Sequence, residues 1–223
     1  MNLLIIGANG QIGQHVVSKL QSSKAHHAIA MVRKEEQRAK FEEQGAQTIL
    51  VDLEGSIEGI ARAAREADAI VFTAGSGGHT GADKTMMIDL DGAIKSMEAA
   101  KLAGVRRFVM VSAIGVHHRE KWMESAPYYS AAKHYADVWL TQSGLDYTIL
   151  RPGRLTNEAG TGKVAVAVDL DRGSIPREDV ASTIVASLDN PHTIGKAFEL
   201  VSGDTPIEEA VPKVNFGTAS PTK

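Results

Sequence analysis

Short apolar runs alternate with longer amphipathic stretches along most of this chain. Most of the short runs are continuous in apolar residues, a pattern typical of strands that are buried on both faces of a sheet. The strands predicted in this way are residues 3–6, 28–32, 48–51, 69–73, 108–112 and 147–150.

The stretches between these runs have apolar positions at helical spacing. The predicted helices are residues 12–20, 34–43, 57–66, 86–102 and 130–141. Strand and helix therefore alternate repeatedly, which implies right-handed crossovers and a parallel sheet covered by helices on both faces. The pattern predicts an α/β fold of the Rossmann type, with a doubly wound parallel sheet in a three-layer αβα arrangement.

The pattern changes after residue 151. Residues 163–168 and 197–201 are consistent with strands and residues 177–188 with a helix, but this part is too short for an independent domain. We therefore predict one domain over residues 1–214, in which residues 151–214 include a small substrate-side region. It would pack over the carboxyl edge of the sheet, where ligands of such folds bind. The polar residues 215–223 are expected to form a flexible tail.

Composition narrows the classes of protein that need to be considered. The 223 residues include no cysteine, which excludes a disulfide scaffold, a thiolate metal site and a cysteine nucleophile. The net charge of −3 comes from interspersed acidic and basic residues, unlike the basic stripe of a nucleic-acid-binding protein. No apolar run reaches the roughly 18 residues of a membrane span. We expect a cytoplasmic monomer or homodimer that acts on a small molecule and binds neither nucleic acid nor membrane.

Three glycines follow the first predicted strand and begin the first predicted helix. Gly7 permits a tight turn, Gly10 lets a pyrophosphate approach the backbone, and Gly13 lets the helix pack closely on the strand. The helix N-terminus then offers N–H groups to phosphate oxygens. A plain strand-to-helix turn is the alternative, but the position after the first strand favours a dinucleotide site. The predicted contacts in this turn are Gly7, Asn9, Gly10, Gln11, Ile12 and Gly13.

The end of the second predicted strand indicates which dinucleotide is bound. Proteins that bind NAD usually place a carboxylate there, roughly 20 residues after the glycines, to hold the ribose 2′-hydroxyl. This chain has Arg33 and Lys34 instead. A guanidinium can bind a 2′-phosphate in a fork, which favours NADP over NAD. In the alternative, Arg33 only begins a solvated helix, since Glu35 and Glu36 follow. The cofactor could then be NAD.

A tyrosine and a lysine four residues apart suggest acid–base chemistry. Tyr129 and Lys133 share one face of a predicted helix. A nearby ammonium favours the phenolate, so the tyrosine would transfer a proton closer to neutral pH than its free pKa of about 10 allows. Ser112 ends the fifth predicted strand and can hydrogen-bond a substrate oxygen. The alternatives are a structural or cofactor-only role for this set, or Tyr128 as the active phenol.

The spacing G-x-x-G-x-x-G over residues 7–13 resembles the short-chain dehydrogenase/reductase superfamily, in its extended and atypical branches. The similarity covers residues 1 to about 210. It is closest to bacterial sugar-epimerase-like reductases with NmrA-like and flavin/biliverdin-reductase-like relatives. The resemblance implies that Ser112, Tyr129 and Lys133 form the catalytic triad of that superfamily, in which the lysine also holds the nicotinamide ribose.

The resemblance also implies further cofactor contacts. The pair matched by Asp52-Leu53 lies beside the adenine in that superfamily, and the small-residue pair matched by Ala74-Gly75 lies along the cofactor. The backbone of the pair matched by Pro152-Gly153 passes the nicotinamide ring. Asp52 could equally cap the helix that follows it. Asp89 stands where the family pattern has an asparagine, which puts the water or proton relay at that position in doubt.

The eight histidines include two adjacent pairs, His26-His27 and His117-His118. Neighbouring histidines do not face one metal ion from a helix, and no third ligand stands at a suitable spacing. We therefore expect no metal site.

Three functions fit these observations. The first is an NADP-dependent oxidoreductase that acts on an unidentified small carbonyl or similar acceptor. The second is an NmrA-like sensor or regulator that binds NADP(H) without turnover. The third is a nucleotide-sugar epimerase or dehydratase. It is disfavoured because only about 70 residues follow Pro152, too few for the usual substrate domain.

Overall fold

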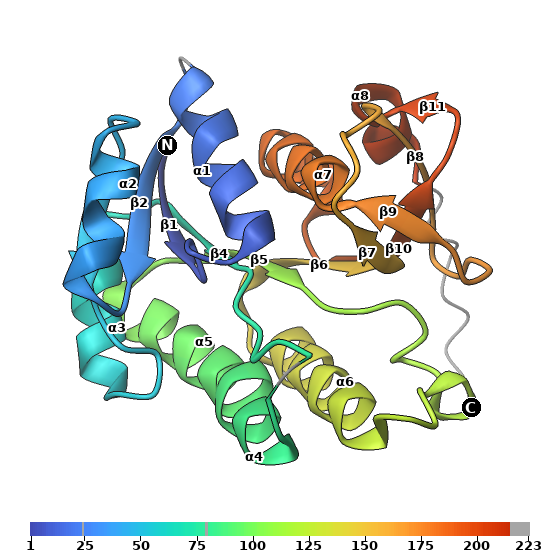
Figure 1. Ribbon diagram of the computed structural model, residues 1–223, viewed down its shortest axis with the longest axis horizontal. Coiled ribbons are helices and arrows are strands. Elements are labelled where there is room, and N and C mark those ends of the chain that lie inside the picture. The colour runs from blue at the N-terminus through green and yellow to red at the C-terminus, as the bar shows by residue number, and fades with distance from the viewer. Residues whose placement is uncertain (24, 79, 215–223) are drawn as a thin grey trace.

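The computed structural model describes residues 1–23, 25–78 and 80–214. Helices cover both faces of a central sheet (Figure 1). The predicted tail, residues 215–223, lies outside the described residues. No helix in the described ranges has the length and apolar character needed to cross a membrane.

The central sheet has nine strands. From one edge to the other they are β11 (Thr205–Pro206), β8 (Lys163–Ala167), β10 (Lys196–Ser202), β6 (Asp146–Pro152), β5 (Arg107–Val111), β4 (Ala69–Phe72), β1 (Asn2–Ile6), β2 (His27–Val32) and β3 (Gln47–Leu50). All neighbouring pairs from β10 to β3 are parallel, whereas β8 is antiparallel to both β10 and β11. A second small sheet pairs β7 (Arg154–Thr156) with β9 (Ser174–Pro176).

Two helical layers cover this sheet. One face carries α1 (Gln11–Ser22), α7 (Arg177–Asp189) and α8 (Ile207–Ala210), with the short α2 (Arg38–Glu42) contributing Phe41 to the same core. The other face carries α3 (Ile57–Ala64), α5 (Gly92–Ala103) and α6 (Pro127–Gln142). Figure 1 shows α1 and α7 on one side of the strands and α5 and α6 on the other. The predicted Rossmann-type α/β fold is confirmed.

The strand β1 shows why the apolar runs are continuous. Leu3 and Ile5 belong to the core beneath α1, whereas Leu4 and Ile6 belong to the core beneath α3 and α5. Successive side chains of a strand point to opposite faces, so a strand with helices on both sides needs an apolar residue at every position.

The strand order creates a crevice for a ligand. From β1 the chain moves outward through β2 to β3, then crosses back to β4 on the opposite side of β1. The carboxyl ends of β1 and β4 therefore flank the point where the winding changes direction, which is where open α/β sheets bind their ligands.

Several elements differ from the sequence prediction. The predicted helix 86–102 falls on two consecutive segments, a π-helix (Thr85–Asp91) and α5, and the short α4 (Ala82–Lys84) comes directly before them. The predicted helix 34–43 is divided between a 3₁₀ turn (Glu35–Gln37) and α2. Three strands, β7, β9 and β11, were not predicted because two or three residues carry no periodic signal. Further 3₁₀ turns occupy Arg119–Lys121, Pro191–Thr193 and Val211–Lys213.

Candidate functional site

The glycine turn after β1 leaves room in front of Gly10. Gly7 has a φ of +91°, and a Cβ there would lie 2.5 Å from the backbone nitrogen of Ala74. A Cβ on Gly13 would lie 2.3 Å from the carbonyl oxygen of Gly7. A Cβ on Gly10 would meet only that same oxygen, at 3.2 Å. Packing therefore explains the first and third glycines, and the open space at Gly10 fits a pyrophosphate.

The N-terminus of α1 is suited to an anion. Gly10 is its N-cap residue, and no side chain among the described residues caps the helix. Asn9 and Gln11 are exposed, whereas Ile12 packs into the core. Unpaired N–H groups and the positive end of the helix dipole bind phosphate oxygens well. This turn can therefore hold the pyrophosphate of a dinucleotide.

The segment after β4 lies directly against the glycine turn. The Thr73 hydroxyl donates hydrogen bonds to the carbonyl oxygens of Ile6 and Gly7, at 3.2 and 3.3 Å. Ala74 is half-buried and Gly75 is exposed. These two small residues follow β4 and lie beside the glycine turn, and their contact with a cofactor stays a prediction.

Cations lie beside the end of β2. Arg33 is exposed, and its guanidinium has no hydrogen bond or ion pair in the part of the chain that the structure describes. Lys34 lies 3.6 Å from Glu36. A hydrogen bond with Glu54 is the main cause of the raised pKa of Lys84, while the positive charge of Arg33 acts in the opposite direction. Arg33 and Lys84 are therefore close enough to interact, and Arg33 is free to bind a phosphate.

Asp52 and Leu53 follow β3 and have distinct surroundings. The carboxylate of Asp52 accepts a hydrogen bond from the backbone N–H of Glu54, at 3.0 Å. The N-cap of α3 is Ser56, whose hydroxyl accepts from the Gly59 N–H, so Asp52 does not cap this helix. Leu53 is buried and packs over Gly92. A Cβ added to Gly92 would lie 2.9 Å from the side chain of Leu53.

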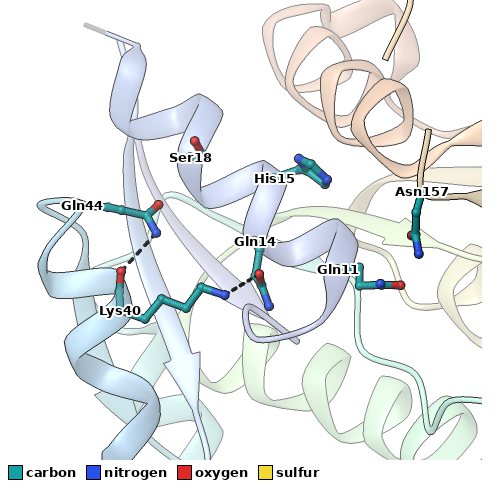
Figure 2. Close-up of a pocket in the computed structure, with 7 residues that line it drawn as sticks. All are labelled: Gln11, Gln14, His15, Ser18, Lys40, Gln44 and Asn157. Carbon is teal, nitrogen blue, oxygen red and sulfur yellow. Dashed lines mark hydrogen bonds between the residues drawn. The ribbon is translucent and has the colours of Figure 1, made fainter. Parts of the chain in front are cut away.

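A pocket of about 440 Å³ lies along the exposed side of α1 (Figure 2). Polar side chains line it: Gln11, Gln14, His15, Ser18, Lys40, Gln44 and Asn157. Gln11 is the only member that belongs to the predicted cofactor contacts, and none of the predicted catalytic residues contributes to it. This pocket and the residues predicted to be catalytic are therefore separate features of the structure.

The helix α6 presents three polar side chains on one face. Tyr129, Lys133 and Asp137 follow one another at intervals of four residues, and both charged residues are buried. Ser112 follows the last residue of β5 and is also buried. Its hydroxyl has no hydrogen-bond partner among the described residues, which leaves it available to a ligand oxygen.

Lys133 has a carboxylate partner that was not predicted. Its ammonium lies 3.8 Å from the carboxylate of Asp89, which is buried in the π-helix that packs against α6. Asp89 also accepts a hydrogen bond of 2.9 Å from the backbone N–H of Ser76, in the segment after β4. The departure from the family pattern at Asp89 therefore lies beside the candidate catalytic lysine. It connects that lysine to the segment that borders the cofactor crevice.

The pKa of Tyr129 is raised rather than lowered. Burial is the largest cause, and the charges of Asp89 and Asp137 act in the same direction. Lys133 lowers the pKa but does not outweigh these effects. The expectation that Lys133 brings the phenol close to neutrality is therefore wrong for this structure. Tyr129 is a protonated phenol at neutral pH, the form that can donate a proton.

A second buried ion pair lies next to this face. The guanidinium of Arg151 donates a hydrogen bond of 2.8 Å to Asp137. Pro152 then accepts the N–H of Ile114, at 3.0 Å, which joins the end of β6 to the loop after Ser112. Gly153 has a packing role, since a Cβ there would lie 2.4 Å from the carbonyl oxygen of Gly173.

Comparison with known proteins identifies the family. Residues 7–191 match the NAD(P)H-binding family, and the chain belongs to it. The predicted membership of the short-chain dehydrogenase/reductase superfamily, in its epimerase-like and reductase-like branch, is confirmed.

Three relatives show how far the similarity extends. An uncharacterized sugar epimerase, YhfK, from Bacillus subtilis is 58% identical over 214 residues, which cover 96% of this chain and 100% of the relative. A solved structure from Bacillus halodurans, provisionally named an NAD-dependent epimerase/dehydratase, has a TM-score of 0.91, 45% identity and coverage of 96% and 100%. The anaerobillin reductase ChuY from Escherichia coli O157:H7 has a TM-score of 0.77, 25% identity and coverage of 92% and 98%.

Proposed function

We propose that this protein is an NADP-dependent oxidoreductase that reduces a small carbonyl or similar acceptor. The observation that carries the proposal is the buried face of α6, where the protonated phenol of Tyr129 and the ammonium of Lys133 lie one helical turn apart. A reductase among the solved relatives supports the same class of reaction.

The roles of the residues follow from their chemistry. When bound, NADPH supplies the hydride that reaches the carbonyl carbon. Tyr129 donates its phenolic proton to the oxygen, so that the carbonyl becomes an alcohol. The free hydroxyl of Ser112 orients the same oxygen. Lys133 provides a positive charge beside the phenol and offers N–H donors to the nicotinamide ribose.

A binding panel followed by a turnover screen tests the proposed function. Thermal shifts with NADPH, NADH and flavin measure which of them stabilises the fold. A screen of carbonyl and quinone acceptors then measures NADPH oxidation. We expect the largest shift with NADPH and turnover of at least one acceptor.

The second candidate is an NADP(H)-binding redox sensor. The 3.8 Å pair between Lys133 and Asp89 favours it, because this contact engages the lysine ammonium with a carboxylate of the protein, whereas catalysis would use the ammonium beside the phenol and the nicotinamide ribose. Tight binding of NADPH without turnover of any acceptor would support the sensor over the enzyme.

Arg33→Asp is expected to weaken NADPH binding far more than NADH binding. The change replaces a guanidinium that can bind the 2′-phosphate with a carboxylate that repels it. The loss of one charge-assisted contact costs about 1.5–3 kcal/mol, or about 10- to 150-fold in affinity. Titration of each nucleotide against the purified variant measures this difference. Arg65→Asp, an equal change of charge just after α3, is the control and leaves both affinities unchanged. Equal losses for the two nucleotides at Arg33→Asp would contradict the preference for NADP.

Asp89→Asn is expected to lower the pKa of Tyr129, because the negative charge of Asp89 is one cause of its upward shift. The protonated phenol is the active form in reduction, so activity decreases as the pH rises through this pKa. The variant should therefore lose activity at lower pH than the wild type. The pH profile of kcat/KM measures the shift, and absorbance titration of tyrosinate measures it without turnover.

The amide side chain introduced by this substitution keeps an oxygen for the Ser76 N–H. It also leaves the buried ammonium of Lys133 without its carboxylate, so thermal unfolding is used to check that the variant is folded before its pH profile is compared. Asp91→Asn is the control, since Asp91 belongs to the same π-helix but pairs with Lys95, at 3.3 Å, and its side chain is 47% exposed. An unchanged or upward-shifted profile in Asp89→Asn would refute the electrostatic role of this carboxylate.

A further inference from the structure

Two histidines and an aspartate converge outside the site described above. The histidines are in the loop that follows β5 and Ser112, and the aspartate is in the loop that follows β8. The Oδ1 atom of Asp169 lies 3.0 Å from Nε2 of His117 and 2.6 Å from Nε2 of His118. One ligand atom from each residue can be chosen so that all three lie within 4.8 Å of one another.

Each imidazole has a second carboxylate behind its other nitrogen. Nδ1 of His117 lies 3.7 Å from Oε1 of Glu199, and Nδ1 of His118 lies 3.6 Å from Oε1 of Glu120. Metal-binding histidines almost always direct their second ring nitrogen to a carboxylate, a carbonyl or water, which fixes the ring and raises its basicity. Both separations are longer than a hydrogen bond, so each second ring nitrogen faces a carboxylate without being bonded to it, and Nδ1 of His117 has no hydrogen-bond partner among the described residues.

Glu199 also fixes the two loops relative to each other. It is fully buried in β10 and accepts the backbone N–H of Gly115 at 2.6 Å and that of Leu170 at 2.7 Å. Gly115 belongs to the loop with the histidines, and Leu170 is adjacent to Asp169. The two loops that carry His117, His118 and Asp169 are thus joined through the carboxylate of Glu199.

We propose that His117, His118 and Asp169 form a binding site for a divalent transition-metal ion of the zinc class. Zinc binds imidazole nitrogen and carboxylate oxygen at about 2.0–2.2 Å in tetrahedral sites, so neighbouring ligand atoms are about 3.2–3.6 Å apart. The Asp169 contacts of 2.6 and 3.0 Å need to lengthen by less than about 1 Å. Two nitrogens and one oxygen suit Zn²⁺, Co²⁺ or Ni²⁺, whereas Ca²⁺ and Mg²⁺ prefer oxygen ligands.

Lys121 competes for the same carboxylate. Its ammonium lies 3.5 Å from Oδ1 of Asp169, and the side chain is 42% exposed, so it can turn into solvent when an ion binds. Removal of this charge should therefore strengthen metal binding.

The sequence predicts no metal site because adjacent histidines diverge on a helix. The structure places this pair in a loop just before the 3₁₀ turn Arg119–Lys121, and the third group comes from 51 residues beyond His118. The proposal is independent of the proposed reductase function, since it rests only on the geometry of these two loops.

Titration of the chelator-treated full chain with Zn²⁺ and with Co²⁺ tests the site. We expect one ion per chain, with His118→Gln and Asp169→Asn each binding at least 10-fold more weakly. Lys121→Gln should bind more tightly than the wild type. His192→Gln is the matched control, because it removes an exposed histidine of the turn Pro191–Thr193 and should leave the affinity unchanged.

Thermal unfolding provides a second measurement. Excess Zn²⁺ should raise the Tm of the wild type and of His192→Gln, because the ion joins two loops only in the folded state. The same Zn²⁺ concentration should raise the Tm of Asp169→Asn much less, because a weaker site gains less stabilisation from it, and circular dichroism checks that this variant is folded. The proposal is overturned if the wild type binds no ion, if Asp169→Asn binds as tightly as the wild type, or if His192→Gln weakens binding as much as His118→Gln does.

Discussion

Tyr129→Phe is expected to reduce the rate of carbonyl reduction by about 10²- to 10⁴-fold, the usual cost of losing a general acid. The substitution removes one hydroxyl and keeps the ring, so the packing of α6 should persist. The affinity for NADPH should change little. Steady-state kinetics with an acceptor from the turnover screen measures the rate. Thermal unfolding with and without NADPH measures the stability of the fold and the stabilisation by the cofactor.

Tyr128→Phe is the matched control for this experiment. Tyr128 is the preceding residue of α6 and is 40% exposed, whereas Lys133 and Asp137 on the face of Tyr129 are buried. Adjacent helical residues point about 100° apart, so the two phenols cannot occupy the same position. A fall in rate with Tyr128→Phe and native turnover with Tyr129→Phe would transfer the role to Tyr128. Native turnover in both variants would mean that the proton comes from another group or from solvent.

Tyr129 provides a cleaner test than Lys133. Replacement of Lys133 by methionine would leave the buried carboxylate of Asp89 without its cation, which lies 3.8 Å away. An unpaired buried charge is strongly destabilising. A loss of activity in that variant would therefore mix a catalytic effect with an effect on folding.

Gly10→Val is expected to abolish dinucleotide binding while the fold is retained. Gly10 has φ −70° and ψ 160°, a conformation that valine adopts readily, and a Cβ there would meet only the Gly7 carbonyl oxygen, at 3.2 Å. The branched side chain would instead fill the space in front of α1 where the pyrophosphate is expected. NADPH at about 100 times its Kd stabilises a protein by about 2.7 kcal/mol, and this increment should be absent in the variant.

Two other glycines provide contrasts. Gly59→Val changes a glycine in α3 whose Cβ would have only ordinary contacts, with the nearest atom at 3.5 Å, so NADPH binding should persist. Gly13→Val would force side-chain atoms into the backbone of the turn, 2.3 Å from the Gly7 oxygen, and should prevent normal folding. Full stabilisation of Gly10→Val by NADPH would show that the dinucleotide binds elsewhere.

The sequence by itself determined the layers of the fold and the location of the glycine turn. These features depend on local signals. A strand that has helices on both faces needs an apolar residue at each position, as in residues 3–6, and a turn with positive φ needs a glycine such as Gly7. The pairing of Tyr129 with Lys133 was also visible in the sequence, because a spacing of four places two residues on one helix face.

Only the tertiary structure decided the electrostatics of the candidate site. The pKa of Tyr129 depends on burial and on the charges of Asp89 and Asp137 as well as on Lys133. Asp89 lies 44 positions before Lys133 in the chain, and it reaches the lysine because the π-helix packs against α6. Sequence spacing gives no measure of burial or of such long-range contacts, so the direction of the pKa shift was predicted incorrectly.

The contact between the loops that carry His118 and Asp169 could not be predicted from the sequence either. The separation of 51 residues between His118 and Asp169 hides their contact, and it forms because the buried carboxylate of Glu199 binds the backbone of both loops. Local patterns report on the conformation of one segment and on the face that it buries. Contacts between loops depend on how the strands beneath them are ordered in the sheet, and here that order places β8 and β5 on either side of β10 and β6.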